Sequence, residues 1–129
     1  MQLEDKSVLI TGGASGLGLA TALFCQSQGA SVTVLDLNQE ALAQVQQTYG
    51  FAILQANVAQ ADEVETALSS MGDVHVVVNC AGIVAGKGIV GKSGPQALCD
   101  FSKVIEVNLI GTFNIMRVAA AKMLQQESL

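Results

Sequence analysis

The residues best suited to chemistry are glycines in a turn near the amino end and one carboxylate that follows them. The turn covers residues 11–18, directly after the apolar run 7–10, and its conspicuous glycines are Gly12, Gly16 and Gly18. Glycine adopts positive φ freely, and its missing Cβ lets backbone N–H groups approach a pyrophosphate at the start of a helix. Asp36 lies 18 residues after Gly18 at the end of the next apolar run, where an acid can bind an adenosine ribose. The pattern predicts a dinucleotide-binding site.

The elements that must hold this site alternate between apolar runs of strand length and longer segments with helical periodicity. Four strands are expected, over residues 7–10, 31–35, 52–55 and 74–78. Helices are expected over about 16–28, 39–47 and 62–68, from about residue 101, and over 112–126. This alternation is typical of βαβ units around a parallel sheet whose inner strands, including the fourth, are covered on both faces. We therefore predict an α/β fold, a Rossmann-type doubly wound parallel sheet, in one domain over residues 1–129.

A glycine-rich segment over residues 80–95 indicates a long surface loop with two solvated lysines, Lys87 and Lys92. Residues 86–93 also match G-x-x-x-x-G-K-S, the phosphate loop of nucleoside triphosphatases. A phosphate loop begins at the end of a strand and runs straight into a helix, whereas here residues 80–85 intervene and Gly94 and Pro95 follow. A triphosphatase is therefore the weaker alternative.

Composition narrows the range of partners. Half of the residues are hydrophobic and the formal net charge is -5 with six Lys and Arg, so no basic stripe is available for nucleic acid. No uninterrupted apolar stretch reaches the roughly 18 residues of a membrane span, and the N-terminus is acidic, so we expect no membrane contact and a cytoplasmic location. The cysteines, Cys25, Cys80 and Cys99, are far apart and are expected to be reduced and inert.

Four signatures occur in the same order as in the short-chain dehydrogenase/reductases, and the chain resembles that family. They are TGGASGLG at residues 11–18, Asp36, Asn79-Cys80-Ala81-Gly82, and Asn108 within VNLIGTF. The stretches GGASGLGLAT, VNCAGI and GTFN are most similar to the type-II 3-hydroxyacyl-CoA dehydrogenase branch, also called 17β-hydroxysteroid dehydrogenase type 10. The resemblance implies hydride transfer between a nicotinamide cofactor and a secondary alcohol or ketone, with 3-hydroxyacyl-CoA thioesters as candidate substrates. A homo-oligomer is expected as well, because the strand over residues 74–78 and the helix over 112–126 would be left partly uncovered.

The resemblance also assigns residues to the cofactor. The pyrophosphate turn would comprise Gly12, Ser15, Gly16, Leu17 and Gly18. Asp36 would bind the adenosine ribose, Asn57 and Val58 would hold the adenine, and Asn79, Ala81 and Gly82 would flank the cofactor. Because Asn57 stands where the family usually has Asp, weaker adenine recognition is expected. Neither Ser15 nor Leu37 is basic, so nothing evident near Asp36 would neutralise a 2′-phosphate, which favours NAD over NADP.

The catalytic residues of the family are only partly represented. Asn108 resembles the catalytic asparagine that kinks its helix and holds a water in a proton relay. The family also uses a Ser and a Tyr-x-x-x-Lys pair, in which the Lys lowers the pKa of the Tyr so that it can act as a general base. The only tyrosine, Tyr49, is followed four positions later by Ile53. We therefore expect the N-terminal half of such an enzyme, able to bind cofactor but inactive by itself.

Two further alternatives stay open. One is a non-catalytic nucleotide-binding or assembly module that works through a partner. The other is a methyltransferase, which shares the acid after the second strand but does not predict residues 79–82 or Asn108.

Overall fold

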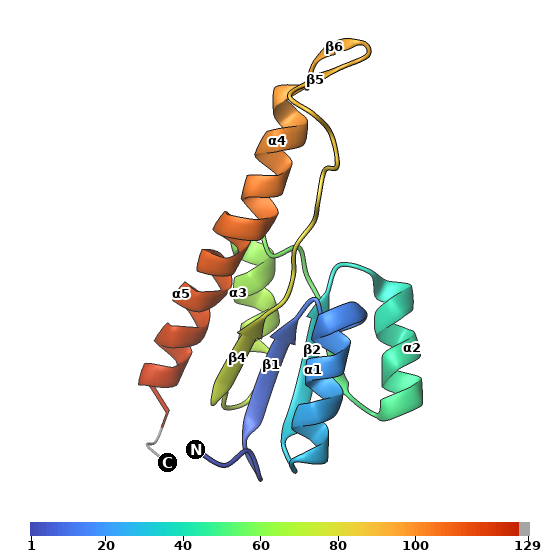
Figure 1. Cartoon of the computed structure of the whole chain (residues 1–129). Helices are drawn as coiled ribbons and strands as arrows, with labels where there is room; N and C mark the ends of the chain where they lie inside the picture. Colours follow the sequence, from blue (N-terminus) through green and yellow to red (C-terminus); the bar gives the residue numbers. More distant parts are fainter. Residues whose placement is uncertain (127–129) are drawn as a thin grey trace.

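Four parallel strands form the sheet of the computed structural model, which describes residues 1–126 (Figure 1). The strands are β1 (Ser7–Thr11), β2 (Ser31–Asp36), β3 (Ala52–Gln55) and β4 (Val76–Asn79), in the order β3-β2-β1-β4. The register sets Thr11 beside both Leu35 and Asn79, and Asp36 beside Gln55. The carboxyl ends of all four strands therefore meet at one edge of the sheet. The predicted α/β class with a parallel Rossmann-type sheet is confirmed.

Helices cover both faces of the sheet. They are α1 (Gly16–Ser27), α2 (Gln39–Tyr49), α3 (Ala61–Ser69), α4 (Leu98–Ile105), the π-helical turn η1 (Glu106–Ile110) and α5 (Gly111–Leu124). Val8 and Ile10 pack with α1 and α2 on one face, whereas Leu9 packs with α3 and α5 on the other. All three side chains are fully buried, as expected for a central parallel strand. Strand β1 thus lies between two hydrophobic cores.

Strand β4 begins at Val76, two residues later than predicted, because side chains replace backbone bonds before it. The Ser7 N–H donates to His75 Nδ1 at 2.8 Å, while the His75 N–H donates to the Ser7 carbonyl at 2.9 Å. The N–H and C=O of Val74 both bind the side-chain amide of Gln126, at 2.6 and 2.8 Å. In the described part of the chain β4 pairs only with β1, and its residues are half-buried, so the cover expected on both faces is incomplete.

The segment predicted as a loop contains a small antiparallel hairpin. Its strands are β5 (Val90–Gly91) and β6 (Gly94–Pro95), and Gly94 has a φ of 118° beside the turn. Strands of two residues leave no periodicity in the sequence, so the hairpin could not be predicted. Lys87 is exposed as expected, and it also forms an ion pair, because its Nζ lies 2.7 Å from Asp100 Oδ2 at the start of α4. This hydrogen bond and the charge of Asp100 raise the pKa of Lys87.

Helix α4, the turn η1 and helix α5 continue as one helix from Leu98 to Leu124, where the sequence predicted two (Figure 1). By length and composition this helix could cross a membrane, with a mean hydropathy of 1.3 over its most apolar window. Only 22% of that window is buried in the protein, although Ile115 and Ala119 are buried in the core beneath the helix. One such helix is weak evidence for a span. The absence of membrane contact stays a prediction.

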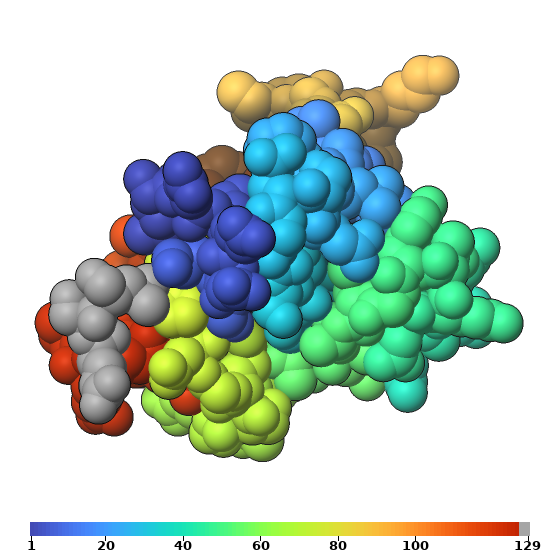
Figure 2. Space-filling view, turned by 90° about the horizontal axis from the view of Figure 1, so that it is seen from below, coloured from blue at the N-terminus to red at the C-terminus, as the bar shows by residue number. Residues whose placement is uncertain are grey.

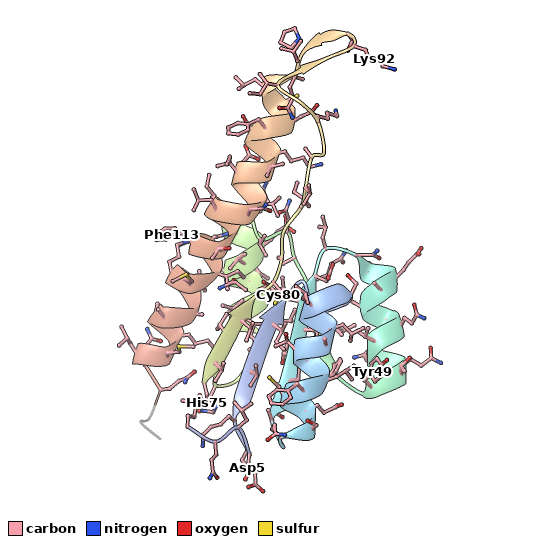
Figure 3. The ribbon with its side chains drawn as sticks, in the orientation of Figure 1. Asp5, Tyr49, His75, Cys80, Lys92 and Phe113 are labelled. Atoms are coloured by element: carbon pink, nitrogen blue, oxygen red, sulfur yellow. The ribbon has the colours of Figure 1, made fainter. Side chains whose placement is uncertain are left out.

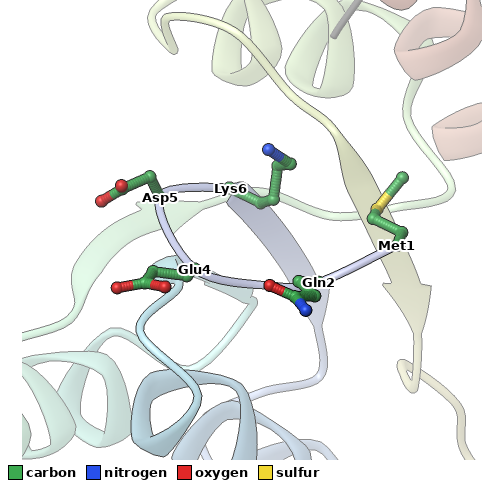
Figure 4. Close-up of a pocket in the computed structure, with 5 residues that line it drawn as sticks. All are labelled: Met1, Gln2, Glu4, Asp5 and Lys6. Atoms are coloured by element: carbon green, nitrogen blue, oxygen red, sulfur yellow. The ribbon is translucent and has the colours of Figure 1, made fainter.

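The amino ends of the strands lie at the face shown in Figure 2, which includes the N-terminal segment (blue). An open hollow of about 450 Å³ lies there, lined by Met1, Gln2, Glu4, Asp5 and Lys6 (Figure 4). All of these residues belong to one short stretch of chain, and none belongs to the predicted signatures. The hollow is therefore not a candidate for the chemistry.

We predict that Gly111→Ala destabilises the protein, although alanine favours helices by about 1 kcal/mol over glycine. A Cβ at this position would lie 2.5 Å from Val58 Cγ2 and 3.2 Å from Val58 Cβ. Val58 is buried and β-branched, so its side chain cannot rotate aside freely. We expect the free energy of unfolding to fall by about 1–3 kcal/mol, measured by chemical denaturation.

Gly72→Ala provides the control, because a Cβ there would meet no atom within 4 Å and should change stability little. The double variant Gly111→Ala/Val58→Ala should lose less stability than the sum of the two single variants. Strict additivity would show that the contact with Val58 is not the cause.

Candidate functional site

A cleft of about 530 Å³ lies at the carboxyl ends of the strands. It is lined by Gly12, residues 15–18, 35–37, 56–58 and 80–83, and by Lys103 and Val107. These residues come from the turns after β1, β2, β3 and β4 and from the long helix. Of the eleven residues that the sequence assigned to the cofactor, all except Asn79 line this cleft. Ligands of open α/β sheets bind in such crevices at the carboxyl edge.

The glycine turn packs too closely for side chains at two positions. A Cβ on Gly12, whose φ is 65°, would lie 2.7 Å from the Ala81 nitrogen. A Cβ on Gly18 would meet the Gly12 carbonyl group, 2.7 Å from its carbon. At Gly16, with a φ of 56°, a Cβ would meet nothing within 4 Å. The turn is thus tight towards the protein and open towards the cleft.

Helix α1 begins at this turn without a side-chain cap. Ser15 is the N-cap residue, but its side chain makes no capping hydrogen bond, and the first turn of α1 carries no acidic residue. The first N–H groups of a helix have no partner within the helix, and the helix dipole favours an anion beside them. This end of α1 is therefore suited to hold a phosphate group.

Asp36 is fixed beside the glycine turn by two backbone N–H groups. Its Oδ2 accepts from the Ala14 N–H at 3.2 Å, and its Oδ1 accepts from the Asn38 N–H at 3.1 Å. A carboxylate has about four acceptor sites, so capacity remains for two ribose hydroxyls. The two parts of the predicted nucleotide site therefore lie side by side.

Thr11 joins the ends of β1 and β4, a role that the sequence reasoning missed. Its hydroxyl oxygen accepts from the Cys80 and Ala81 N–H groups, each at 3.2 Å, and the side chain is fully buried. The only available signal was a polar residue directly after a buried strand. Asn79 lies beside it in the sheet register, and its buried Oδ1 has no hydrogen-bond partner in the described part of the chain.

Asn108 lies in the π-helical turn η1 and holds the segment after β4. Its Oδ1 accepts from the Ile83 N–H and its Nδ2 donates to the Ile83 carbonyl, both at 2.8 Å. Asn108 does not line the main cleft but an adjoining cavity of about 310 Å³, which shares Ile83 with the cleft. The side chain therefore shapes the wall between two cavities.

The residues predicted to hold adenine are themselves positioned by helices. Asn57 Oδ1 accepts from the Ala59 N–H at 3.0 Å, so part of its acceptor capacity is already used. The Val58 carbonyl accepts from Asn114 Nδ2 at 2.8 Å, and Asn114 Oδ1 accepts from Arg117 Nε at 2.8 Å. Asn114 is buried and was not assigned a role from the sequence. The sequence did indicate a special role for Asn114, because it places an amide side chain inside an apolar helix.

The sequence also missed Lys103 and Val107, which reach the cleft from the long helix. The two residues are four positions apart, so they share one face of that helix. Their role could not be inferred from the sequence, because its hydrophobic pattern did not show which face of the long helix would cover the cleft.

The phosphate-loop match does not have the geometry of a phosphate loop. Residues 86–93 run through coil into the hairpin, and the next helix begins only at Leu98. Lys92 lies at the tip of the hairpin, far from Cys80 at the sheet edge (Figure 3). No helix N-terminus therefore directly follows the match.

Among residues 1–126, no group of three or more His, Cys, Asp or Glu could hold a metal ion. The cysteines are free, and burial raises the pKa of the Cys25 thiol, which lowers its reactivity.

Comparison with known proteins gives concordant results. The family model described as short chain dehydrogenase matches residues 6–128. Two relatives named 3-hydroxyacyl-CoA dehydrogenase type-2, from Bos taurus and Homo sapiens, are 47% and 46% identical over 127 residues, which is 92% of this chain and 49% of each relative. A mitochondrial borneol dehydrogenase from Lavandula x intermedia is 33% identical over 98% of this chain and 50% of its own length. The crystal structure of gox2181 superposes with a TM-score of 0.87 at 25% identity, over 97% of this chain and 51% of that one.

The chain thus spans about half the length of the curated relatives it matches. The matched half carries the cleft, the glycine turn and Asn108.

We predict that Asn108→Ala releases the segment after β4. Loss of both hydrogen bonds should lower the free energy of unfolding by about 2 kcal/mol and speed amide exchange at Ile83. Asn108→Asp keeps an acceptor for the Ile83 N–H but sets a carboxylate oxygen against the Ile83 carbonyl. Its Ile83 amide should therefore stay better protected than in the alanine variant.

Hydrogen exchange read by NMR measures these effects, and Gln47→Ala on the exposed face of α2 is the control. Unchanged exchange at Ile83 in Asn108→Ala would mean that the segment is held by other contacts.

Proposed function

Because the chain belongs to the short-chain dehydrogenase family, we propose that it forms the cofactor-binding part of an NAD-dependent oxidoreductase. The reaction would be hydride transfer between the cofactor and a secondary alcohol or the matching ketone. The observation that carries this proposal is the single cleft that unites the glycine turn, Asp36 and the residues after β3 and β4. When bound, the nicotinamide ring supplies the hydride or accepts it.

The residues of the cleft fit such a cofactor. The uncapped start of α1 and the open space at Gly16 suit the pyrophosphate, and the remaining acceptor sites of Asp36 suit the ribose hydroxyls. Val58 would pack against the adenine, while Ala81 and Gly82 would form the wall beside the cofactor. These assignments support NAD over NADP, because the carboxylate of Asp36 would repel a 2′-phosphate.

Asn108 is the catalytic residue in this proposal. By its resemblance to the family it would hold a water in a proton relay. The structure supports a positioning role as well, since both ends of its side-chain amide bind Ile83. The π-helical turn around Asn108 supports the proposal too, because such turns occur frequently at functional sites.

The proposed substrate class is a 3-hydroxyacyl thioester of coenzyme A. The support is the identity with relatives that bear the name 3-hydroxyacyl-CoA dehydrogenase type-2.

We further propose that these residues alone bind cofactor without turning it over. The only tyrosine, Tyr49, packs its ring against Phe51 at a centroid distance of 5.6 Å and has no lysine four positions later. A Ser and a Tyr-x-x-x-Lys pair would have to be supplied outside this sequence for catalysis. If none is supplied, a non-catalytic nucleotide-binding module is the second candidate.

Self-association belongs to the proposal as well. Large apolar side chains are exposed along the long helix, among them Leu109, Phe113 and Met116. Phe113 and Met116 are 65% and 55% exposed. Exposed apolar surface of this kind favours a homo-oligomer. The cytoplasmic location and the absence of nucleic-acid partners stay predictions.

We predict that NAD binds at least about tenfold more tightly than NADP, a difference of about 1.4 kcal/mol. Asp36→Ala should reduce this preference, and Asp36→Ala with Leu37→Arg should reverse it, because the new cation can pair with the 2′-phosphate. Isothermal titration calorimetry with both cofactors measures the ratio.

The matched control is Asp73→Ala, which removes the same charge from an exposed site at the amino ends of the strands. It should leave the ratio unchanged. Equal or tighter binding of NADP by the unaltered protein would remove Asp36 from the ribose site.

A further inference from the structure

The cleft contains one cationic side chain and one anionic side chain. Lys103 is the only basic residue that lines it, and Asp36 is the only acidic one. Lys103 is exposed and takes part in neither of the two ion pairs among residues 1–126, which join Lys87 to Asp100 and Arg117 to Glu65. Its ammonium group is therefore free to meet a ligand.

The phosphates of a dinucleotide would bring negative charge to a cleft that already contains the carboxylate of Asp36. Asp36 is held within hydrogen-bond distance of the glycine turn through the Ala14 N–H. The turn itself offers backbone N–H groups and the Ser15 hydroxyl, but residues 11–18 include no basic side chain. The chain as a whole carries a net charge of -5. A cation from another element would therefore add to the attraction that the N-terminus of α1 exerts on a pyrophosphate.

Helix α4 is the element that can supply it. Lys103 lies one helical turn before Val107, and both line the cleft. The long aliphatic stem of a lysine can lie on an apolar wall while its ammonium group turns towards an anion. This placement sets the cation of α4 and the helix start of α1 on the boundary of the same cleft.

We propose that Lys103 binds the pyrophosphate of the dinucleotide, across the cleft from the glycine turn. The inference rests on the proposed nucleotide-binding function and adds a contact from the long helix, to which the sequence assigned only Asn108. It also gives the chain a way to offset repulsion between Asp36 and the phosphates.

The test compares ligands that contain different parts of the cofactor. Affinities of the whole chain for NAD, ADP and adenosine are measured by calorimetry or by competition, for the unaltered protein and for Lys103→Met. We expect Lys103→Met to weaken binding of NAD and ADP by about five- to tenfold and to leave adenosine unchanged. Lys103→Arg should restore most of the affinity, and the salt dependence of NAD binding should weaken in Lys103→Met.

Lys92→Met is the matched control, because it removes the same charge from the tip of the hairpin, outside the cleft. It should leave all three affinities unchanged. Circular dichroism of both variants checks that the fold is retained, as expected for exposed side chains.

Three results would overturn the proposal. One is an equal loss of affinity for adenosine in Lys103→Met, which indicates packing of the lysine stem alone. The others are no loss of affinity for any ligand, and an equal loss of affinity in Lys92→Met. If the unaltered protein binds neither NAD nor ADP, the proposed function itself fails. If it binds both and Lys103→Met does so equally well, only the role of Lys103 fails.

Discussion

The close approach of Gly12 to the backbone of Ala81 is the contact on which the site depends. The space between them excludes a Cβ, and the buried hydroxyl of Thr11 binds the Cys80 and Ala81 N–H groups beside it. These contacts hold the turn after β1 against the segment after β4. Because the two segments form adjacent walls of the cleft, its shape follows from backbone packing rather than from large side chains. Gly18 extends the same close packing to the first turn of α1.

The long helix sets the other walls. Asn108 binds the backbone of Ile83, Asn114 binds the carbonyl of Val58, and Gly111 leaves room for the Val58 side chain. Asn108 thus contacts the segment after β4, whereas Asn114 and Gly111 contact the turn after β3. The helix itself is anchored by Ile115 and Ala119, whose side chains are buried in one of the two hydrophobic cores. Cleft geometry and core packing are therefore coupled through a single element.

The sequence predicted the sheet, the glycine turn and Asp36 because each depends on local patterns. Strands of four to six mostly apolar residues, positive φ at glycine and an acid at a strand end all leave signals within a few neighbouring positions. The roles of Thr11 and Asn114 depend on contacts between residues 56 to 70 positions apart, and that of Lys103 depends on which face of a helix covers the cleft. The start of β4 was misplaced for a similar reason, since His75 and Gln126 replace backbone partners with side chains. Such substitutions have no periodicity that a sequence could show.

The π-helical turn between α4 and α5 has a consequence for the rotational phase of the long helix. A π turn accommodates one residue more than an α-helical turn, so it shifts all residues before it by about 100° relative to those after it. With this shift, Lys103 and Val107 line the cleft while Ile115 and Ala119 are buried in the core. Removal of one residue from Glu106–Ile110 would convert the turn to regular α-helix and cancel the offset. Either Lys103 and Val107 would then turn away from the cleft, or Ile115 and Ala119 would leave the core. The helix should therefore accept substitutions far more readily than changes in length.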